Sequence, residues 1–143
     1  TIAERVRPCF KAEGIDISDE RKFLAVVDNA RKRVDRIPDM IEHSLPFYLE
    51  LEFSDEDRDL IDNDASQAVL KFISEKLSAK MNWPEEEIKA LLKETAELTR
   101  IKGKELYFPI RMVLFGSPQG PDIPHILEIL GTTEAVTRIN QHR

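Results

Sequence analysis

Apolar residues recur at three- and four-residue intervals along most of the chain, a spacing typical of amphipathic helices. The first clear stripe consists of Phe23, Val26, Val27, Ala30 and Val34. Ser18 or Asp19 precedes this stripe, and either residue is a good helix cap. Pro38 is predicted to break the helix, because proline cannot continue the hydrogen-bond ladder.

A second helix is predicted before Pro46, with an apolar face made of Met40, Ile41 and Leu45. Residues 47–53 alternate weakly between apolar and polar side chains, which would allow one extended segment. Because this stretch follows Pro46 and precedes a run of acidic residues, a connector between two subdomains is the preferred interpretation. The two subdomains are expected to meet near residue 50.

Two longer helices are predicted in the middle of the chain. The first has an apolar side made of Ala65, Ala68, Val69, Phe72, Ile73 and Leu77. Trp83 and Pro84 open the second, and the three glutamates that follow suit the positive end of its dipole. Its inward stripe consists of Ile88, Leu91, Leu92, Thr95 and Leu98. Gly103 is expected to cap its C-terminus.

The final third predicts three short helices. Residues 104–115 carry a core-facing stripe of Leu106, Ile110, Val113 and Leu114. Residues 116–122 form a compact turn, after which Ile123, Ile126, Leu127 and Leu130 belong to a helix that Gly131 stops. Thr132 or Thr133 can cap a last helix through Val136 and Ile139. The predicted fold class is therefore all-α, a helical bundle of two small subdomains, residues 1–50 and 51–143.

The formal net charge of −6 counts against a broad attraction to nucleic acid. Residues 1–49 carry nine basic and nine acidic side chains, residues 50–97 carry six and fourteen, and residues 98–143 carry six and four. One acidic block therefore accounts for the whole deficit. RNA binding is compatible with this layout if the acidic block faces away from the phosphates.

The sequence offers little catalytic chemistry. Cys9 is the only cysteine, and His43, His125 and His142 are too scattered to form a metal site. The five glycines form no loop of the kind that cradles nucleotide phosphates. The acidic residues of 55–64 lack the glycine and the terminal glutamate of an EF-hand calcium loop, so a solvated, helix-capping acidic face is preferred. Catalysis, metal binding and cofactor binding by this segment alone are not expected.

What remains is a set of arginines and one rigid loop. The basic residues Arg31, Lys32, Arg33 and Arg36 crowd one predicted helix end, where the helix dipole alone would also favour cations. Arg111 lies about 140° around its helix from Leu106, so it either extends from the edge of the core or serves in recognition. Residues 116–123 hold two glycines and two prolines, and they form either a tight helix connection or a preorganised recognition surface.

Four stretches carry a family resemblance. The most specific is residues 108–117, FPIRMVLFGS, followed by Gly120-Pro121-Asp122-Ile123. It resembles the anticodon-binding signature of glutamyl-tRNA synthetases, except that Phe115 stands where a threonine or similar small residue is usual. Residues 126–131 with Arg138-Ile139 resemble the closing helices of that family. Residues 5–14 resemble its Arg-Pro-bearing helix, and residues 30–34 with Phe47-Tyr48 resemble its next helix pair. The resemblance covers essentially the whole chain and is weakest across 55–97.

The resemblance implies roles for individual residues. Arg33 falls where many members place an arginine that faces the third anticodon base, a cytosine in glutamate tRNAs. Arg111 falls where the family contacts the first anticodon base. Gly120, Pro121 and Ile123 fall in the loop that packs on the middle base. Phe115 excludes a hydroxyl contact at its position and adds a ring that could stack or join the core.

The implied function is recognition of the anticodon loop of a glutamate-accepting tRNA by the C-terminal region of a glutamate–tRNA ligase. The parent enzyme would use ATP and magnesium in a catalytic domain whose signatures do not occur here, so this segment alone should be inactive. Thr1 is not an initiator Met and no signal-peptide pattern follows it, so we expect a fragment that begins mid-helix. No apolar run approaches the roughly 20 residues of a membrane helix. A cytoplasmic monomer that binds neither DNA nor membranes is expected.

Two other functions are compatible with the residues. The first is a helical protein-interaction module that uses the Gly-Pro loop and the arginine cluster to dock a protein. The second is a free-standing RNA-binding domain of the same fold.

Overall fold

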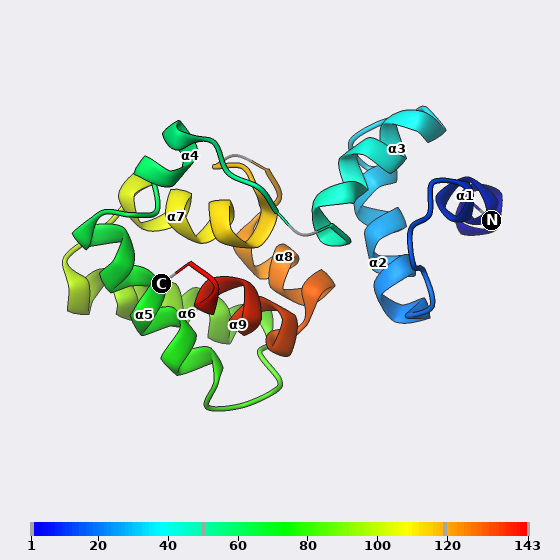
Figure 1. The fold of residues 1–143 in the computed structure, drawn as a ribbon. Coiled ribbons are helices and arrows are strands. Elements are labelled where there is room, and N and C mark those ends of the chain that lie inside the picture. The colour runs from blue at the N-terminus through cyan, green and yellow to red at the C-terminus, as the bar shows by residue number, and fades with distance from the viewer. Residues whose placement is uncertain (1, 50, 119, 143) are drawn as a thin grey trace. The chain divides into compact units, whose positions relative to one another are not determined.

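The computed structural model describes residues 2–49, 51–118 and 120–142, and their regular secondary structure is entirely helical (Figure 1). The prediction of an all-α chain is therefore confirmed. The chain divides into two compact units, residues 1–50 and residues 51–143. Among the described residues, no helix is long and apolar enough to cross a membrane.

The first unit contains three α-helices and one 3-10 turn in its described part: α1 (Ile2–Ala12), α2 (Glu20–Arg31), α3 (Ile37–Ser44) and η1 (Leu45–Phe47). The Asp19 carboxylate accepts the N–H of Lys22 at 3.1 Å, so Asp19 is the N-cap of α2 as predicted. The apolar stripe of α2 is buried up to Ala30. Val34 lies beyond the end of the helix and is only half-buried.

Pro38 does not break α2, contrary to the prediction. The helix already ends at Arg31, and Pro38 lies in the first turn of α3. Proline suits this position because the first turn of a helix needs no donor there and the fixed φ angle of proline is already helical. Residues 32–36 therefore form a connection between two separate helices.

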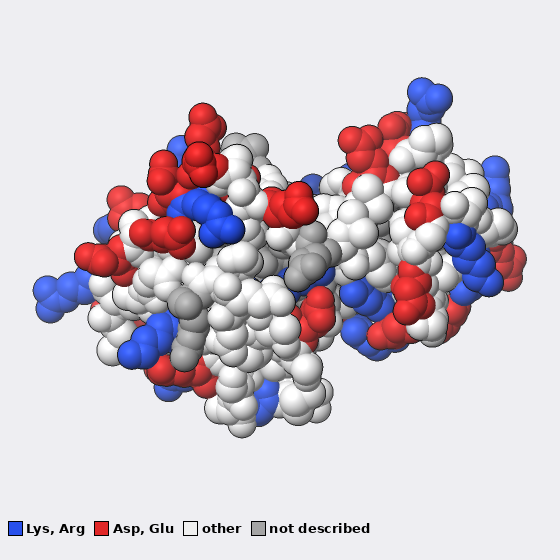
Figure 2. All heavy atoms as spheres, in the orientation of Figure 1, with Lys and Arg blue, Asp and Glu red and all other residues white. Residues whose placement is uncertain are grey.

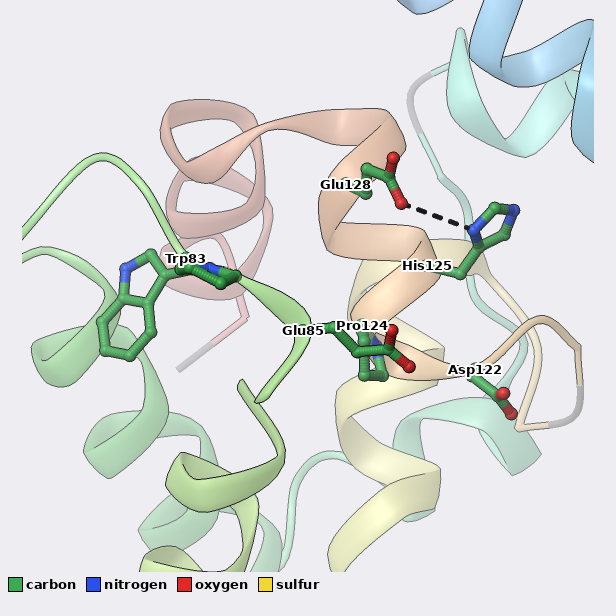
Figure 3. Close-up of a pocket in the computed structure, with 7 residues that line it drawn as sticks. Trp83, Glu85, Asp122, Pro124, His125 and Glu128 are labelled. Carbon is green, nitrogen blue, oxygen red and sulfur yellow. Dashed lines mark ion pairs between the residues drawn. The ribbon is translucent and has the colours of Figure 1, made fainter. Parts of the chain in front are cut away.

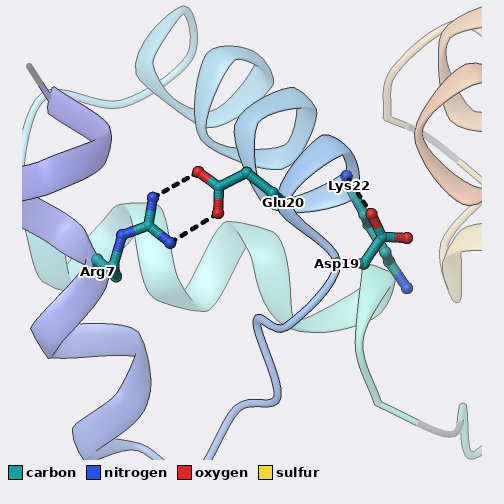
Figure 4. Close-up of polar contacts among 4 residues, drawn as sticks. All are labelled: Arg7, Asp19, Glu20 and Lys22. Atoms are coloured by element: carbon teal, nitrogen blue, oxygen red, sulfur yellow. Dashed lines mark hydrogen bonds and ion pairs between the residues drawn. The ribbon is translucent and has the colours of Figure 1, made fainter.

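Arg7 braces α1 against α2 (Figure 4). Its guanidinium donates two hydrogen bonds to the Glu20 carboxylate, at 2.9 and 2.6 Å. It also lies 4.7 Å from the centre of the Phe23 ring, and that ring packs edge-on against Phe10 at 5.4 Å. A paired, fork-like arginine of this kind orients the two helices through both charge and shape.

The second unit contains α4 (Asp55–Asp59), α5 (Asp64–Leu77), α6 (Glu85–Thr99), α7 (Lys104–Phe115), α8 (Ile123–Leu130) and α9 (Thr132–Asn140). Helix α5 packs against α6, α7 and α9, and α7 packs against α8 and α9 (Figure 1). The core of this unit includes the fully buried residues Leu70, Leu77, Ile88, Leu106, Ile110, Leu114 and Ile126. Helix α7, which carries the most specific sequence motif, thus lies among three other helices of this unit.

Helix α4 carries the acidic run. Ser54 and Asp57 form a capping box, in which the Ser54 hydroxyl accepts the Asp57 N–H at 3.2 Å and the Asp57 carboxylate accepts the Ser54 N–H at 3.3 Å. Figure 2 shows acidic side chains gathered over this part of the second unit. The prediction of a helix-capping acidic surface is therefore confirmed.

Two of the predicted apolar stripes differ in detail from the buried faces. On α5, Ala68 is exposed and Leu70 is buried, because this helix packs on three neighbours and buries a wider face than one stripe. On α6, Leu98 is 64% exposed. It lies at the edge of its stripe in the last turn of the helix.

Gly103 does not cap α6, contrary to the prediction. The helix ends at Thr99, and Arg100 takes the left-handed conformation at its C-cap, with φ 61°. Arg100 is the one non-glycine residue with positive φ in the described part of the chain. Glycine is usual at such a position, and another residue costs about 1 kcal/mol there. Gly103, with φ 66°, instead becomes the N-cap of α7.

Thr132 and Thr133 are not N-caps, because Gly131 takes that position in α9. The Thr132 hydroxyl instead donates to the carbonyl oxygen of Met81 at 2.6 Å. This bond ties the start of α9 to the loop between α5 and α6. Trp83 holds the same loop, since its indole N–H contacts the carbonyl oxygens of Leu77 and Lys80 at 3.3 and 3.1 Å.

Candidate nucleic-acid interface

The C-terminal end of α7 is held by a buried arginine. Arg138, on α9, is 7% exposed and donates from Nη1 to the carbonyl oxygen of Leu114 at 2.7 Å. Its Nε donates to the Glu134 carboxylate at 3.1 Å. The last carbonyls of a helix lack partners within the helix, and Arg138 supplies one. Sequence reasoning gave Arg138 no structural role.

The loop after α7 is shaped by a glycine that lies on an aromatic ring. Gly116 ends the helix with φ 83°, and Gly120 has φ 152°. A Cβ atom on Gly120 would lie 2.7 Å from Cε2 and 2.9 Å from Cδ2 of Phe115. Phe115 is 7% exposed, so its ring belongs to the core and supports the loop from below.

Arg111 projects from α7 toward the same loop. Its Nε donates to the carbonyl oxygen of Pro121 at 3.3 Å, and its Nη2 lies 4.0 Å from the Asp122 carboxylate. The guanidinium is 5.9 Å from the centre of the Tyr107 ring, one helical turn earlier. These contacts hold the guanidinium at the edge of a hollow of about 210 Å³, which is lined by Lys89, Leu92, Tyr107, Arg111, Asp122, Ile123 and Pro124.

A neighbouring hollow of about 500 Å³ has the opposite electrostatic character (Figure 3). It is lined by Trp83, Pro84, Glu85, Asp122, Pro124, His125 and Glu128. His125 Nδ1 lies 3.8 Å from the Glu128 carboxylate. The carboxylates of this hollow repel phosphate groups, so a nucleic acid would approach the loop from the side of Arg111.

In the first unit, the basic residues at and just after the end of α2 differ in whether they form ion pairs. Arg31 and Lys32 both pair with Asp28, at 2.9 and 3.1 Å. Arg33 and Arg36 are exposed, and within the described residues neither has an ion pair or a side-chain hydrogen bond. The helix dipole and Asp28 therefore explain why cations occur at Arg31 and Lys32, whereas the guanidinium of Arg33 remains available to a ligand.

Comparisons with known proteins place the chain in a family. The family model described as "Anticodon binding domain" matches residues 1–143. The chain belongs to this anticodon-binding domain family. It is 34% identical over 120 residues to a glutamate–tRNA ligase of Carboxydothermus hydrogenoformans, a match that covers 83% of this chain and 25% of that enzyme. The anticodon-binding domain thus spans about a quarter of the length of the curated relative it matches.

Two solved structures share the fold of this anticodon-binding domain. A glutamate tRNA ligase from Elizabethkingia meningosepticum, solved in complex with its amino acid, matches with a TM-score of 0.84 and 22% identity, over 99% of this chain and 28% of that chain. A glutamate–tRNA synthetase from Elizabethkingia anophelis matches with a TM-score of 0.74 and 24% identity, over 98% and 28%. The family resemblance found in the sequence is therefore confirmed.

Four of the five predicted site residues of the anticodon-binding domain lie together. Arg111, Gly120, Pro121 and Ile123 meet at the C-terminal end of α7, and Arg33 belongs to the other unit. Of the three predicted loop residues, Pro121 is buried and Ile123 is 2% exposed, whereas Gly120 is exposed. Tyr107 was missed, although its four-residue spacing from Arg111 was visible in the sequence.

The positive charge of Arg33 affects the pKa of His43 on α3. Partial burial, and then the positive charge of Arg33, lower the pKa of His43 below its usual value of 6.5. His43 is therefore a neutral neighbour of Arg33 at physiological pH.

Within the described residues, no cluster of three or more His, Cys, Asp or Glu side chains could hold a metal ion.

The lowered pKa of His43 predicts a pH dependence of stability in the first unit. Below a pH of about 6.5 the unfolded chain binds a proton that the folded chain resists, so stability falls as pH falls through the folded-state pKa. Above a pH of about 6.5, His43 is neutral in both the folded and the unfolded chain, and it no longer makes the free energy of unfolding depend on pH. Thermal melts followed by circular dichroism should show a smaller pH dependence for His43→Gln than for the unaltered chain. Equal dependence would show that His43 does not contribute.

Proposed function

We propose that this chain binds the anticodon loop of a glutamate-accepting tRNA, as the anticodon-binding region of a glutamate–tRNA ligase. The observation that carries the proposal is the 34% identity over 120 residues to such a ligase, within an anticodon-binding family match over residues 1–143. The geometry supports it, because Arg33 is exposed without an ion pair among the described residues and Arg111 contacts the carbonyl oxygen of Pro121, at positions that the family resemblance selects.

Arg33 is proposed to face the third anticodon base. Bases of a single-stranded loop expose their pairing edges. Cytosine presents two adjacent acceptors there, and a guanidinium presents a fork of donors only. Guanine would turn two N–H donors toward that fork and leave them unpaired. Since glutamate and glutamine tRNAs differ at this base, Arg33 would discriminate against the glutamine tRNA by about 1–3 kcal/mol.

Arg111 is proposed to contact the first anticodon base, which would enter the hollow beside it. The hollow of about 210 Å³ has a fixed cation at its edge and the Tyr107 ring in its wall, and an unstacked base favours both. The middle base would lie on the loop that contains Gly120, Pro121 and Ile123. Because Pro121 and Ile123 are buried, they would act by supporting the backbone of Gly120.

The ligase chemistry is proposed for the remainder of the parent protein. ATP and magnesium would bind in its catalytic domain, and this chain alone would bind RNA without aminoacylating it. The parent enzyme would act in the cytoplasm, and we propose that it is a monomer.

The test is a binding titration of the chain with labelled anticodon stem-loops that differ at the first or the third base. The unaltered chain should prefer cytosine over guanine at the third base by roughly 5- to 150-fold. Arg33→Gln should remove most of this preference while changing the affinity for other loops less. Arg111→Gln should instead weaken selectivity at the first base.

Arg31→Gln is the matched control, since Arg31 has the same charge two residues earlier but pairs with Asp28. It should retain the third-base preference. If Arg33→Gln and Arg111→Gln lowered affinity equally for all stem-loops, both arginines would be phosphate contacts and the base-specific roles would be wrong. If the unaltered chain bound no stem-loop even at low salt, a protein-interaction module would be favoured.

A further inference from the structure

The connection between α6 and α7 lies at the opposite end of α7 from the loop that follows Phe115 (Figure 1). The connection between α6 and α7, together with the first residue of α7, carries three basic side chains within five residues, Arg100, Lys102 and Lys104. All three are exposed. None forms an ion pair or a side-chain hydrogen bond within the described part of the chain. Glu105 is the acidic side chain next to them.

Three other lysines of the second unit pair with carboxylates. Lys76 pairs with Glu94 at 3.7 Å, Lys80 with Glu87 at 2.5 Å, and Lys89 with Glu85 at 3.2 Å. Arg58, Lys71 and Lys93 also lack ion pairs among the described residues, but they stand on three separate helices. Arg100, Lys102 and Lys104 instead lie within five residues of one another, which leaves a local positive field.

The backbone of the connection also favours an anionic ligand. Arg100 has a left-handed backbone conformation that glycine would adopt with less strain. An arginine at this position therefore lowers the stability of the fold relative to glycine. Gly103 offers no side chain to accept the N–H groups in the first turn of α7. Such N–H groups and the positive end of the helix dipole attract phosphate.

The geometry of α7 relates these three cations to the proposed anticodon site. The helix has 12 residues, which rise about 18 Å. At about 3.4 Å for each nucleotide along one strand, this length corresponds to roughly five nucleotide steps. An RNA arm whose loop bases meet the Gly116–Ile123 loop can therefore bring its own backbone to the other end of the helix.

We propose that Arg100, Lys102 and Lys104 bind backbone phosphates of the RNA arm whose bases are recognised at the other end of α7. The inference rests on the proposed function. It assigns these residues to affinity and not to base selectivity, since phosphate contacts carry no sequence information directly. An acidic protein surface is the alternative partner of these three cations. A loss of RNA affinity on their removal favours RNA, and an unchanged RNA affinity favours the acidic protein surface.

The test compares two triple variants of the chain that remove the same charge. Arg100→Gln, Lys102→Gln and Lys104→Gln are combined in the first. Arg58→Gln, Lys71→Gln and Lys93→Gln are combined in the control, because these exposed cations also lack ion pairs among the described residues but are dispersed over three helices. Affinity for an anticodon stem-loop is measured over a series of salt concentrations.

The first triple variant should bind about tenfold or more weakly near 100 mM salt. The slope of log affinity against log salt should fall by about 2, because each cation that no longer neutralises a single-strand phosphate lowers the slope by about 0.7. Its preference for cytosine at the third base should be unchanged. The control should keep both the affinity and the slope to within a small difference.

Arg100→Gly separates a structural role from a binding role. It should raise the melting temperature, by on the order of 4 °C, because glycine relieves the left-handed strain. It should nevertheless lower RNA affinity by about twofold to threefold. Higher stability with unchanged affinity would overturn the role of Arg100.

The two proposals fail in different ways. Equal salt slopes for the two triple variants, with base preference intact, would overturn the phosphate contact and leave the anticodon function standing. Absence of base preference in the unaltered chain would overturn the anticodon function, whatever the salt slopes. Failure of the unaltered chain to bind any stem-loop would overturn both.

Discussion

Arg138→Ala is expected to lower the free energy of unfolding of residues 51–143 by about 3 kcal/mol. The substitution removes a buried guanidinium that donates to the carbonyl oxygen of Leu114 at 2.7 Å and to the Glu134 carboxylate. The carbonyl then lies in the interior without that donor, and removal of the side chain leaves a cavity. The C-terminal end of α7 is then no longer fixed to α9 by this hydrogen bond.

Trp83 makes this effect measurable in one unit. It is the one tryptophan in the sequence and lies in the second unit, so intrinsic fluorescence during urea denaturation follows that unit. Lys71→Ala, at an exposed position on α5, is the control and should change stability by less than about 0.5 kcal/mol. A similarly small change in Arg138→Ala would mean that the hydrogen bond to Leu114 contributes little to stability.

Gly120→Ala is expected to destabilise the second unit by about 2 kcal/mol and to weaken RNA binding by about tenfold. Alanine disfavours φ 152°, and its Cβ would lie 2.7 Å from Cε2 of the Phe115 ring. The loop must shift away from the ring, and the carbonyl of Pro121 that accepts from Arg111 shifts with it. Urea denaturation and stem-loop titration measure the two effects.

Gly103→Ala separates the clash from the cost of positive φ. Gly103 has φ 66°, and a Cβ atom there would meet no atom within 4 Å. Its stability loss should be about 1 kcal/mol, smaller than that of Gly120→Ala. Adding Phe115→Leu to Gly120→Ala should make the double variant more stable than the sum of the single losses predicts. Strict additivity would show that the ring and the glycine do not interact as described.

Helix α7 could be predicted from sequence to the residue, because several local signals agree there. The apolar period and the Gly-Ser-Pro turn after Phe115 both favour a helix within residues 104–115. Pro38 and Gly103 were misassigned for one shared reason. Each residue type occurs at both ends of helices, and only the neighbouring backbone decides which end it serves.

The cations of the proposed site could be located from the sequence, but the contacts that hold its helices and loop in place could not. Asp28 lies three and four residues before Arg31 and Lys32, a spacing that favours ion pairs on a helix, whereas Arg33 lies five residues after it. The hydrogen bond between Arg138 and Leu114 spans 24 residues and joins two helices. The packing of Gly120 on Phe115 depends on a loop conformation. No periodicity encodes interactions of these kinds, because they exist only once the helices have packed.

Pro109 lies within α7, between the turn that begins at Lys104 and the turn that carries Arg111. It has no N–H to donate to the carbonyl of Glu105, so the hydrogen-bond ladder of the helix is interrupted at that step. Substitutions in the first turn therefore disturb the later turns less than they would in an unbroken helix. Under the two proposals above, substitutions near Lys104 would change how tightly the chain binds RNA and leave unchanged the base that Arg111 contacts.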